Sequence, residues 1–295
     1  MAACGADDHA RLRRSAGLTV QLFQTSHGPA RREGDELVVL EGPADLIELA
    51  MSAEVADASE VKRLPMSGVV LFAPVVPAQI VIVGLNYRSH VEEIGQPVPE
   101  AIIFVVSDRV DALGGPGTSI VLPADASERV DYEGEMAIVI GRAASDVDAA
   151  DAWSYIAGVT AANDVTARDV QRQGLSSGDF TTAKTFPTFK PLGPGLITGS
   201  EARGTLSIRT SVNGEVRQDA YTDELIFAIP DILATVSKTV ALHPGDVILT
   251  GSPAGVGLMK DKFLTPGDVV EVWLGDLPPL RNPVVAADDA AEDHP

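Results

Sequence analysis

A run of acidic residues leads directly into an apolar segment typical of a strand: Asp131-Tyr132-Glu133-Gly134-Glu135 is followed by Met136-Ala137-Ile138-Val139-Ile140-Gly141. Side chains alternate between the two faces of a β-strand, so Glu133 and Glu135 are expected close together on one face. Two carboxylates held that close repel, and near neutral pH they persist only if one is protonated or a cation lies between them. A hard divalent ion, which prefers oxygen ligands, would fill that position. The segment therefore predicts a strand that carries a cation site at its beginning.

The composition indicates a globular protein with a small partner. Hydrophobic residues make up 45% of the 295 residues, enough for a substantial core and too many for a disordered chain. The chain has 22 basic and 42 acidic residues, a formal net charge of −20. This charge disfavours nucleic acid and anionic membranes as partners. We therefore expect a small-molecule ligand, with no nucleic acid and no membrane as partner.

The cysteine content is compatible with a reducing compartment, because Cys4 is the single cysteine and no internal disulfide can form. The N-terminus shows no basic segment leading into an apolar core, and no later segment has the length of a membrane-spanning helix. We predict a cytoplasmic location and an inert, exposed thiol at Cys4.

The beginning of the chain predicts a small domain of its own. Residues 17–42 are expected to form a short meander, with strands at 18–23 and 36–40 joined by a polar turn. Residues 44–63 carry a helical pattern rich in Ala, Leu and Glu. Together these features predict a small N-terminal domain over residues 1–75, with a disordered start.

The main part of the chain, residues 76–285, opens with a buried-type strand at 80–84 and is followed by an acidic tail at 286–295. Most of it has the pattern of short strands separated by Gly, Pro and Asp turns. Further predicted elements are an Asn-Gly hairpin at 212–216, two Pro-Gly-Asp-Val turns at 244–247 and 266–269 that each lead into a strand, and helices at 147–157 and 224–238, with Pro230 near the start of the second. The expected fold class is a β-rich mixed α+β fold.

A histidine and a glutamate follow the strand at 80–84, in a loop position that often carries function. His90 and Glu93 are three residues apart, so on a helical turn the carboxylate faces the imidazole and could orient it or raise its pKa. This is a general acid–base arrangement. The alternative is an exposed salt bridge at the start of a helix.

Three other segments also have both a structural and a functional interpretation. Asp164 follows a stretch of small residues and could cap a helix running through Arg168 and Gln171, or bind a metal ion. Lys184 lies in an aromatic, proline-stiffened segment, where it could be a fixed cation for an acidic ligand or a surface lysine. The glycine-rich residues 251–257 lack dinucleotide spacing and a P-loop lysine, and predict a tight turn lining a pocket.

Taken in order, these segments resemble the fumarylacetoacetate hydrolase family over roughly residues 75 to 285. The stretches that carry the resemblance are Asn86-Tyr87-Arg88-Ser89-His90 with Glu93, Asp131-Tyr132-Glu133-Gly134-Glu135, Asn163-Asp164-Val165-Thr166-Ala167-Arg168-Asp169, Lys184-Thr185-Phe186-Pro187-Thr188-Phe189, and Leu249-Thr250-Gly251-Ser252-Pro253-Ala254-Gly255-Val256-Gly257. The small N-terminal domain and the segment 280–284 also resemble this family's smaller bacterial members, such as acylpyruvate hydrolases and 2-hydroxyhepta-2,4-diene-1,7-dioate isomerases.

The resemblance implies a β-sandwich roll, a homodimer and one Mg²⁺ or Mn²⁺ in each active site. The roles it implies are metal binding by Glu133, Glu135 and Asp164, catalysis by His90, Glu93 and Lys184, and substrate binding by Arg168, Gln171, Thr188 and Ser252. Lys184 and Thr188 would bind the substrate carboxylate or a metal-bound water. Ser252 stands where many relatives have threonine, and the hydroxyl is kept.

The leading prediction for function is a metal-dependent hydrolase that cleaves a C–C bond of acylpyruvate-like 1,3-diketo acids. A decarboxylase or isomerase of 2-oxo-dienoates in aromatic catabolism is the alternative within the family. One departure from the family pattern affects both predictions: relatives commonly carry a lysine in a strand where this chain has Val106. Loss of that cation would alter substrate choice or weaken activity. A catalytically altered member that only binds such ligands is therefore a third possibility.

Overall fold

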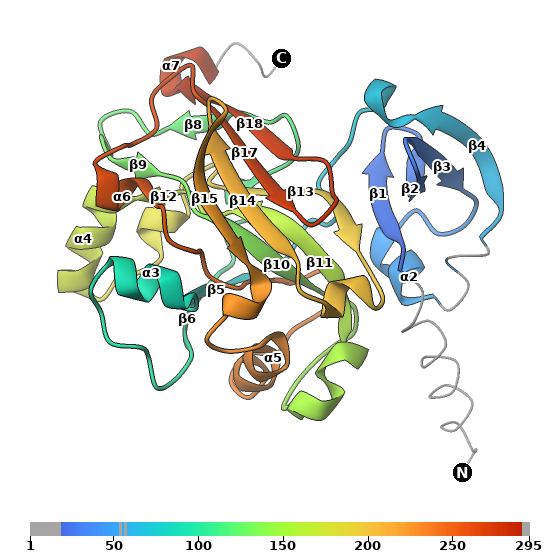
Figure 1. The fold of residues 1–295 in the computed structure, drawn as a ribbon, viewed down its shortest axis with the longest axis horizontal. Helices are drawn as coiled ribbons and strands as arrows, with labels where there is room; N and C mark the ends of the chain where they lie inside the picture. Colours follow the sequence, from blue (N-terminus) through green and yellow to red (C-terminus); the bar gives the residue numbers. More distant parts are fainter. Residues whose placement is uncertain (1–18, 53–54, 56–57, 291–295) are drawn as a thin grey trace.

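The computed structural model describes residues 19–52, 55 and 58–290. Within these residues, a long mixed β-sheet and a five-stranded sheet pack face to face, and a short two-stranded ladder lies at one end of the sandwich (Figure 1). The predicted strand-rich fold with few helices is therefore observed.

The long sheet has β10 near its middle. Its strands, in spatial order, are β4 (Glu60–Pro65), β3 (Glu36–Leu40), β2 (Gly28–Glu33), β1 (Gln21–Thr25), β13 (Lys190–Ile197), β11 (Ile156–Asn163), β10 (Gly134–Ile140), β16 (Val247–Leu249), β5 (Ile80–Gly84) and β6 (Ile103–Ser107), with β7 (Leu113–Gly114) paired to β13. The five-stranded sheet runs β15 (Glu215–Tyr221), β14 (Ser207–Val212), β17 (Val269–Leu274), β18 (Leu280–Ala286) and β8 (Ile120–Leu122), and the ladder joins β12 (Thr166–Ala167) to β9 (Val130–Asp131).

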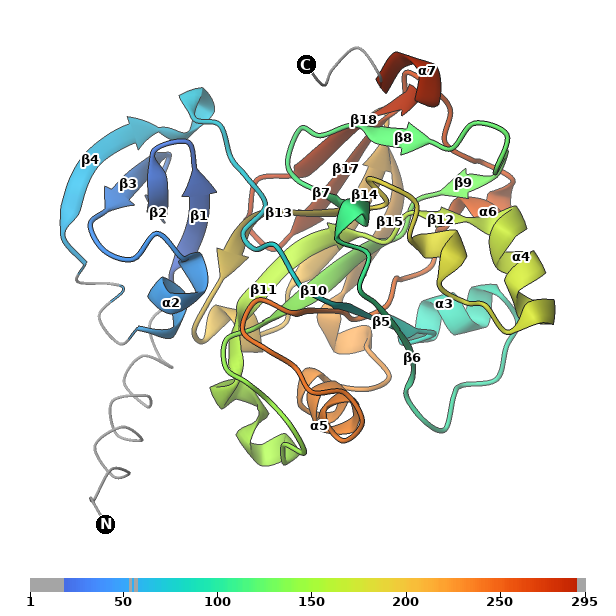
Figure 2. The ribbon, with the colours of Figure 1, turned by 180° about the vertical axis from the view of Figure 1, so that it is seen from behind.

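The helices are short and lie around the sheets (Figure 2). The α-helices are α2 (Leu46–Met51), α3 (Arg88–Glu93), α4 (Arg168–Ser177), α5 (Ile229–Ser237), α6 (Gly257–Lys260) and α7 (Ala287–Ala290). The 3₁₀ turns are η1 (Met66–Gly68), η2 (Val110–Ala112), η3 (Ala149–Ser154), η4 (Thr182–Lys184), η5 (Glu201–Arg203) and η6 (Thr222–Glu224). In the part of the chain that is described, no helix combines the length and the apolar character needed to cross a membrane.

The main core lies between the two sheets. Ile138 of β10 and Ile248 of β16 contribute to it from the long sheet, and Ile208 and Val272 contribute from the five-stranded sheet; all four are buried. All seven residues of β10 are buried, as the apolar run predicts. Burying each such side chain stabilises the fold by about 1.5–3 kcal/mol, so β10 is fixed firmly in position.

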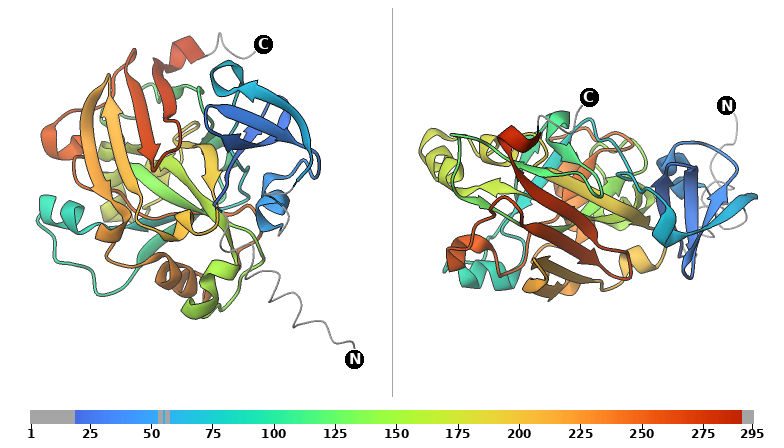
Figure 3. Two further views of the ribbon diagram at one scale, coloured as in Figure 1. Left: turned by 45° about the vertical axis from the view of Figure 1, so that its right-hand side comes forward. Right: turned by 90° about the horizontal axis from the view of Figure 1, so that it is seen from above.

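The N-terminal strands form a lobe beside the sandwich, which the view from above shows most clearly (Figure 3). The lobe continues the long sheet, because β1 pairs with β13 through Leu22 and Leu196. Phe23 packs over Gly195, where an added Cβ would lie 2.6 Å from the phenylalanine ring. The sheet therefore continues from the lobe into the sandwich without a break.

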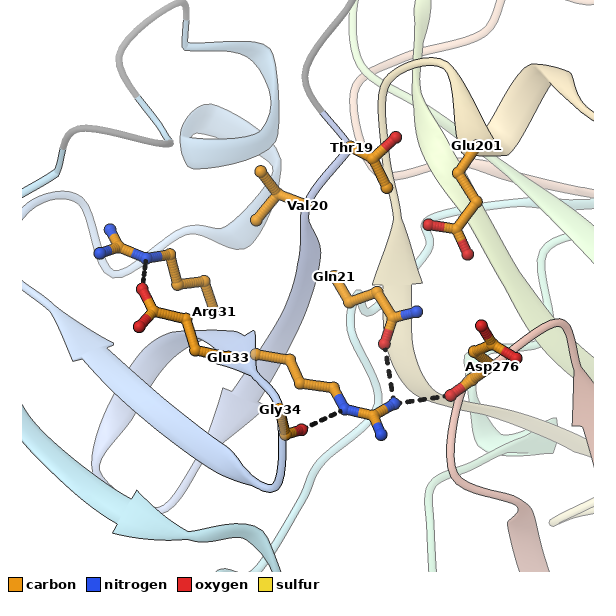
Figure 4. A pocket seen from close by; sticks show the side chains of 9 residues that line it. Thr19, Val20, Gln21, Arg31, Glu33, Gly34, Glu201 and Asp276 are labelled. Carbon is orange, nitrogen blue, oxygen red and sulfur yellow. Dashed lines mark hydrogen bonds and ion pairs between the residues drawn. The ribbon is translucent and has the colours of Figure 1, made fainter.

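A cavity of about 610 Å³ lies between the lobe and the sandwich, lined by β1, β2 and the segments around Glu201 and Asp276 (Figure 4). Arg32 crosses it, donating hydrogen bonds to Gln21 Oε1 at 3.1 Å and to the Asp276 carbonyl at 2.6 Å. This guanidinium therefore links the lobe to the segment between β17 and β18.

Several sequence predictions of local structure are confirmed. Asn213 and Gly214 both have positive φ, as a type I′ hairpin between β14 and β15 requires. Both Pro-Gly-Asp-Val turns lead into strands, β16 and β17. Pro230 lies in the first turn of α5, although this helix begins at Ile229 and the predicted residues 224–228 are not part of it.

Other local predictions are wrong. The helix predicted at 44–63 is confined to α2, and residues 60–65 form β4, because they pair with the edge of β3. The polar turn predicted between the first two strands is mostly β2, which pairs on both sides. At 147–157 the structure has only the 3₁₀ turn η3, since β11 begins at Ile156 and leaves no room for a longer helix. In each case pairing within the sheet outweighs the local preference for a helix or a turn.

The two ends of the chain lie partly outside the described residues. Cys4 and residues 291–295 are among those not described. Of the predicted tail, Ala286 ends β18 and residues 287–290 form α7.

Candidate active site

Three buried carboxylates meet where β10 begins. Glu133, Glu135 and Asp164 each offer an oxygen, and these oxygens all lie within 4.8 Å of one another. Glu133 and Glu135 converge as alternation along a strand predicts. Asp164 joins them because Asn163 pairs with Gly134 across β10 and β11, and the Asp164 N–H donates to the Glu133 carbonyl at 2.8 Å.

Basic side chains surround two of the three carboxylates. Arg168 donates to Glu133 Oε1 at 2.7 Å, and Lys184 Nζ lies 2.8 Å from Glu133 Oε2 and also contacts Asp164. Lys190 Nζ lies 2.8 Å from Asp164 Oδ1. Burial alone would raise the pKa of Glu133, but the charges on Arg168 and Lys184 outweigh it, so this pKa lies well below its ordinary value. Glu133 is therefore ionised.

Glu135 is in the opposite situation. It accepts a hydrogen bond from the Gly251 N–H at 2.7 Å, and in the described structure no basic side chain forms an ion pair with it. Burial, followed by the charges on Asp164 and Glu133, raises the pKa of Glu135 well above its ordinary value. The protein side chains thus leave this carboxylate without a neutralising partner.

The charges and donor atoms fit a divalent cation. The buried cluster has four carboxylates and three basic side chains: Asp131, Glu133, Glu135 and Asp164 against Arg168, Lys184 and Lys190. Asp164 Oδ1 has the Lys190 ammonium as an ion-pair partner, and because a carboxylate oxygen carries two lone pairs, one stays available for a cation. Carboxylate oxygens are the ligands that Mg²⁺ and Mn²⁺ prefer. An additional cation held by Glu133, Glu135 and Asp164 would compensate the excess negative charge.

His90 and Glu93 lie on α3, directly after β5. His90 Nδ1 is 3.7 Å from Glu93 Oε2, too long for a hydrogen bond, and it has no hydrogen-bond partner in the described structure. Glu93 Oε2 instead accepts from the Gly255 N–H at 3.0 Å. Helix α3 lies against the glycine-rich segment, because the Ala254 N–H also donates to Ser89 Oγ at 3.4 Å, and Gly251 of the same segment binds Glu135. Both side chains are largely buried, so the exposed salt bridge considered as an alternative is wrong.

The glycine-rich segment 251–257 is an irregular loop with a bend at Ala254, not the predicted tight turn, and its N–H groups bind acidic side chains. Besides the bonds from Gly251 and Gly255, the Gly257 N–H donates to Asp131 at 2.7 Å. Gly251 and Gly255 have φ values of 98° and 107°, where an L side chain is strained. This backbone therefore holds three acidic residues in one region.

The residues predicted to bind substrate occupy different surroundings. Gln171 accepts a hydrogen bond from Arg168 at 3.0 Å and so belongs to the cluster. The Ser252 hydroxyl is used within the protein, donating to the Gly134 carbonyl at 3.2 Å. Thr188 Oγ1 accepts from the Val121 N–H at 2.8 Å, and no hydrogen bond joins it to the carboxylates in the described residues. Their binding roles stay predictions.

Asp164 is not a helix cap, so that interpretation is wrong. Helix α4 begins at Arg168, with Ala167 at the N-cap position and no side-chain cap. The backbone of Thr166 and Ala167 pairs with β9, which delays the start of the helix and leaves Asp164 free to face Glu133.

Two members of the cluster were given no role from the sequence. Asp131 accepts from Arg168 Nε at 2.8 Å and from two backbone N–H groups of α6. Lys190 is 2% exposed and begins the fully buried strand β13. A lysine at the start of an apolar strand segment is the sequence feature that could have identified it. A charge in such a segment requires a buried partner, here Asp164.

Val106 does not lie on the face of the sheet that carries Glu135, so the prediction that a cation is lost from the site at this position is wrong. Val106 is 38% exposed. The residues that share its face across the sheet are Val81, Ile248 and Ile138. Ile138 and Glu135 are three residues apart on β10, so they point to opposite faces. Val105, not Val106, lies on the face that carries Glu135, and the absence of a lysine at 106 removes no cation from that face.

The fold and the site define a class: a β-sandwich protein with a buried cluster of carboxylates that could hold a cation, and a buried histidine on a neighbouring helix. Residues 79–285 match the family model described as fumarylacetoacetate (FAA) hydrolase C-terminal. The chain belongs to the fumarylacetoacetate hydrolase family, and the resemblance seen in its sequence is confirmed.

Relatives cover most of the chain. An uncharacterized protein of Archaeoglobus fulgidus is 45% identical over 226 residues, which is 77% of this chain and 86% of that protein. The mitochondrial oxaloacetate tautomerase FAHD2A of Bos taurus is 42% identical over 234 residues, 77% of this chain and 73% of that protein.

Solved structures confirm the fold class. The 2-hydroxyhepta-2,4-diene-1,7-dioate isomerase from Mycobacterium marinum has a TM-score of 0.76 and 33% identity, covering 91% of this chain and 99% of that chain. The 5-carboxymethyl-2-hydroxymuconate delta-isomerase from Mycobacterium smegmatis has a TM-score of 0.74 and 34% identity, covering 91% and 100%. A fumarylacetoacetate hydrolase from Exiguobacterium antarcticum has a TM-score of 0.76 and 30% identity, covering 91% and 99%.

Proposed function

We propose that this chain is a divalent-metal-dependent tautomerase or isomerase of 2-oxo acids, with a dicarboxylate such as oxaloacetate as substrate. The observation that carries this proposal is the buried imidazole of His90, which has no hydrogen bond to Glu93 and lies on a helix bonded to the glycine-rich segment that holds Glu135. Proton transfer needs one such group beside the substrate. The names of the tautomerase and isomerase relatives support the same reaction type.

Mg²⁺ or Mn²⁺ held by Glu133, Glu135 and Asp164 would stabilise the negative charge that develops on the substrate's oxo oxygen. Glu133, kept ionised by its basic neighbours, and Asp164 supply fixed negative charge for the ion. Lys184, 12% exposed, would place its ammonium beside a substrate carboxylate.

His90 would move the proton. A keto–enol tautomerisation takes a proton from the carbon next to the oxo group and adds one to the oxo oxygen, so it balances without water or another reactant. The imidazole would accept the carbon-bound proton and return it to the oxygen, and the Glu93 carboxylate at 3.7 Å would stabilise the imidazolium in between.

A C–C hydrolase, the leading prediction from the sequence, is the second candidate. The observation that favours it is the same His90–Glu93 pair, since a modest movement would form the hydrogen bond that a water-activating dyad needs. The hydrolase from Exiguobacterium antarcticum supports it as well. The homodimer and the cytoplasmic location belong to this proposal, and light scattering on the purified protein tests the dimer.

Product analysis of Mn²⁺-loaded protein tests the proposal, with an EDTA-treated control and a panel of oxaloacetate, 2-oxo-dienoates and acylpyruvates. We expect metal-dependent interconversion of keto and enol forms, or a shifted double bond, with every carbon retained in one molecule. Release of pyruvate and a free acid would establish the hydrolase instead, and release of CO₂ a decarboxylase. Metal binding without any turnover would indicate a protein that only binds such ligands.

A pair of histidine variants tests the role of His90. His90→Gln should lower turnover by about 10²–10⁴-fold, the usual contribution of general acid–base catalysis, while Mn²⁺ still binds. His243→Gln is the matched control, because His243 Nδ1 also lies 3.7 Å from a carboxylate three residues later but is exposed. Equal activity of the two variants would contradict the assignment.

A further inference from the structure

A buried amide side chain connects the two sheets at the carboxylate cluster. Gln218 of β15 is 1% exposed, and its side chain bonds from the five-stranded sheet to the start of β10 in the long sheet. Its Oε1 accepts from the Gly134 N–H at 2.9 Å. Its Nε2 donates to Ser252 Oγ at 2.7 Å and to the Pro253 carbonyl at 2.8 Å. All three partners belong to segments that hold the site.

The residue that Gln218 holds lies between two of the carboxylates. Gly134 separates Glu133 from Glu135, and both of its backbone polar groups are bound by side chains, the N–H by Gln218 and the carbonyl by Ser252. A Cβ at this position would lie 1.9 Å from Thr210 Oγ1, so the backbone is pressed against β14. The peptides that join Gly134 to Glu133 and to Glu135 are therefore both fixed by side chains outside their own strand.

We propose that Gln218 is a positioning residue that aims Glu133 and Glu135 at a shared cation. The proposal rests on the proposed function, because it takes the cluster as a metal site. Rotation of the peptide between Glu133 and Gly134 would turn the two carboxylates away from each other. The amide of Gln218 opposes that rotation because it binds the N–H of this peptide. The same amide fixes the Ser252–Pro253 segment, next to the Gly251 N–H that binds Glu135. Side chains that orient metal ligands typically contribute 10- to 100-fold in metal affinity.

A purely structural role for Gln218 makes a different prediction. A buried amide with three hydrogen bonds stabilises any fold, and its removal lowers stability without reference to the site. Asn282 of β18 offers a matched control in the same five-stranded sheet. It is also 1% exposed, and its Nδ2 donates to the carbonyls of Gly115 at 2.9 Å and Thr118 at 2.8 Å. In the described structure it has no hydrogen bond to the carboxylate cluster.

The experiment compares Gln218→Met with Asn282→Leu by thermal unfolding and by calorimetric titration of the metal-free proteins with Mn²⁺. We expect both variants to lose stability, and only Gln218→Met to lose Mn²⁺ affinity, by about tenfold or more. Equal Mn²⁺ affinity of the two variants would overturn the inference. Absence of Mn²⁺ binding by the wild-type protein would overturn the proposed function as well, so the two failures are distinguishable.

Ser252→Ala keeps the test usable if Gln218→Met does not fold. It removes the hydroxyl that binds the Gly134 carbonyl but leaves the amide of Gln218 in place. We expect a smaller, severalfold loss of Mn²⁺ affinity. Where Gln218→Met folds, the double variant should lose less affinity than the product of the two single effects, because both side chains hold Gly134 and are bonded to each other. An unchanged affinity in Ser252→Ala, or independent effects in the double variant, would count against the inference.

Discussion

At the scale of single residues, Glu135 has the least favourable surroundings in the site. It is 1% exposed, and its neighbours Asp164 and Glu133 carry the same charge. Glu133, two residues earlier, is stabilised in its charged form by Arg168 and Lys184. The pKa values of two carboxylates in one cluster are thus shifted in opposite directions, because basic side chains reach Glu133 and not Glu135.

This contrast predicts the pH dependence of the metal-free protein. Burial and like charges raise the pKa of Glu135 above its unfolded value, so its contribution to stability is complete at low pH and is lost as the pH rises through the raised pKa. Glu133 has the opposite sign, and its contribution is lost as the pH falls. Above the ordinary carboxyl range, EDTA-treated Glu135→Gln should therefore exceed wild type in unfolding free energy, and this gap should widen as the pH rises toward the raised pKa.

Urea unfolding of both proteins across a pH series measures this gap. Exposed Glu128→Gln serves as the control and should follow the wild-type curve. Added Mn²⁺ should stabilise wild type but not Glu135→Gln, because the variant lacks a ligand. A Glu135→Gln curve parallel to wild type at all pH values would refute the assigned surroundings of Glu135.

At the scale of secondary-structure elements, Asp131 links three segments that are distant in sequence. Its carboxylate at the end of β9 accepts from Arg168 of α4 and from the N–H groups of Gly257 and Leu258 in α6. Arg168 in turn holds Glu133. One fully buried acid, Asp131, therefore joins the glycine-rich segment, α4 and the start of β10.

Asp131→Asn should destabilise the protein markedly. The substitution keeps the size of the side chain but removes the charge opposite buried Arg168, and breaking a buried ion pair from one side costs about 3–5 kcal/mol. Asp169→Asn is the control, since Asp169 is partly exposed and accepts from Ser127 and the Glu128 N–H. Its expected cost is about 1 kcal/mol. Urea midpoints that fall equally in both variants would contradict the central position of Asp131.

At the scale of the whole molecule, the N-terminal lobe and the sandwich share a sheet. The pairing of β1 with β13 and the packing of Phe23 over Gly195 tie the lobe to the strand that carries Lys190. Arg32 adds hydrogen bonds across the cavity between them (Figure 4). A continuous sheet with a shared core is expected to unfold as one cooperative unit.

Phe23→Ala tests this coupling. Phe23 is fully buried, so truncation should cost about 3–5 kcal/mol and lower the midpoint of a single thermal transition for the whole chain. Phe72→Ala is the matched control, because Phe72 is 47% exposed and its loss should change the midpoint little. Two separate transitions in calorimetry, with only the first shifted by Phe23→Ala, would show that the lobe folds independently.

The sequence predicted features that depend on neighbouring residues. The spacing of Glu133 and Glu135 before an apolar run predicted their convergence, and Asn213-Gly214 predicted a type I′ hairpin, because both follow from local backbone geometry. The family resemblance added Asp164 to the same cluster. Local patterns failed at β2 and β4, which are strands because a neighbouring strand lies ready to pair with them.

The tertiary structure alone decided which charges meet. Lys190 and Asp131 had no assigned partners in the sequence, and the strand register, not the alignment of a motif, showed that Val106 faces away from Glu135. Gln218 reaches Gly134 from another sheet, 84 positions along the chain. The sequence by itself determined the family, the strand-rich fold and the paired glutamates of the candidate site, since these depend on residue types and short-range spacing. The partners and charge states of the site depend on distances across the folded sheets, which only the tertiary structure sets.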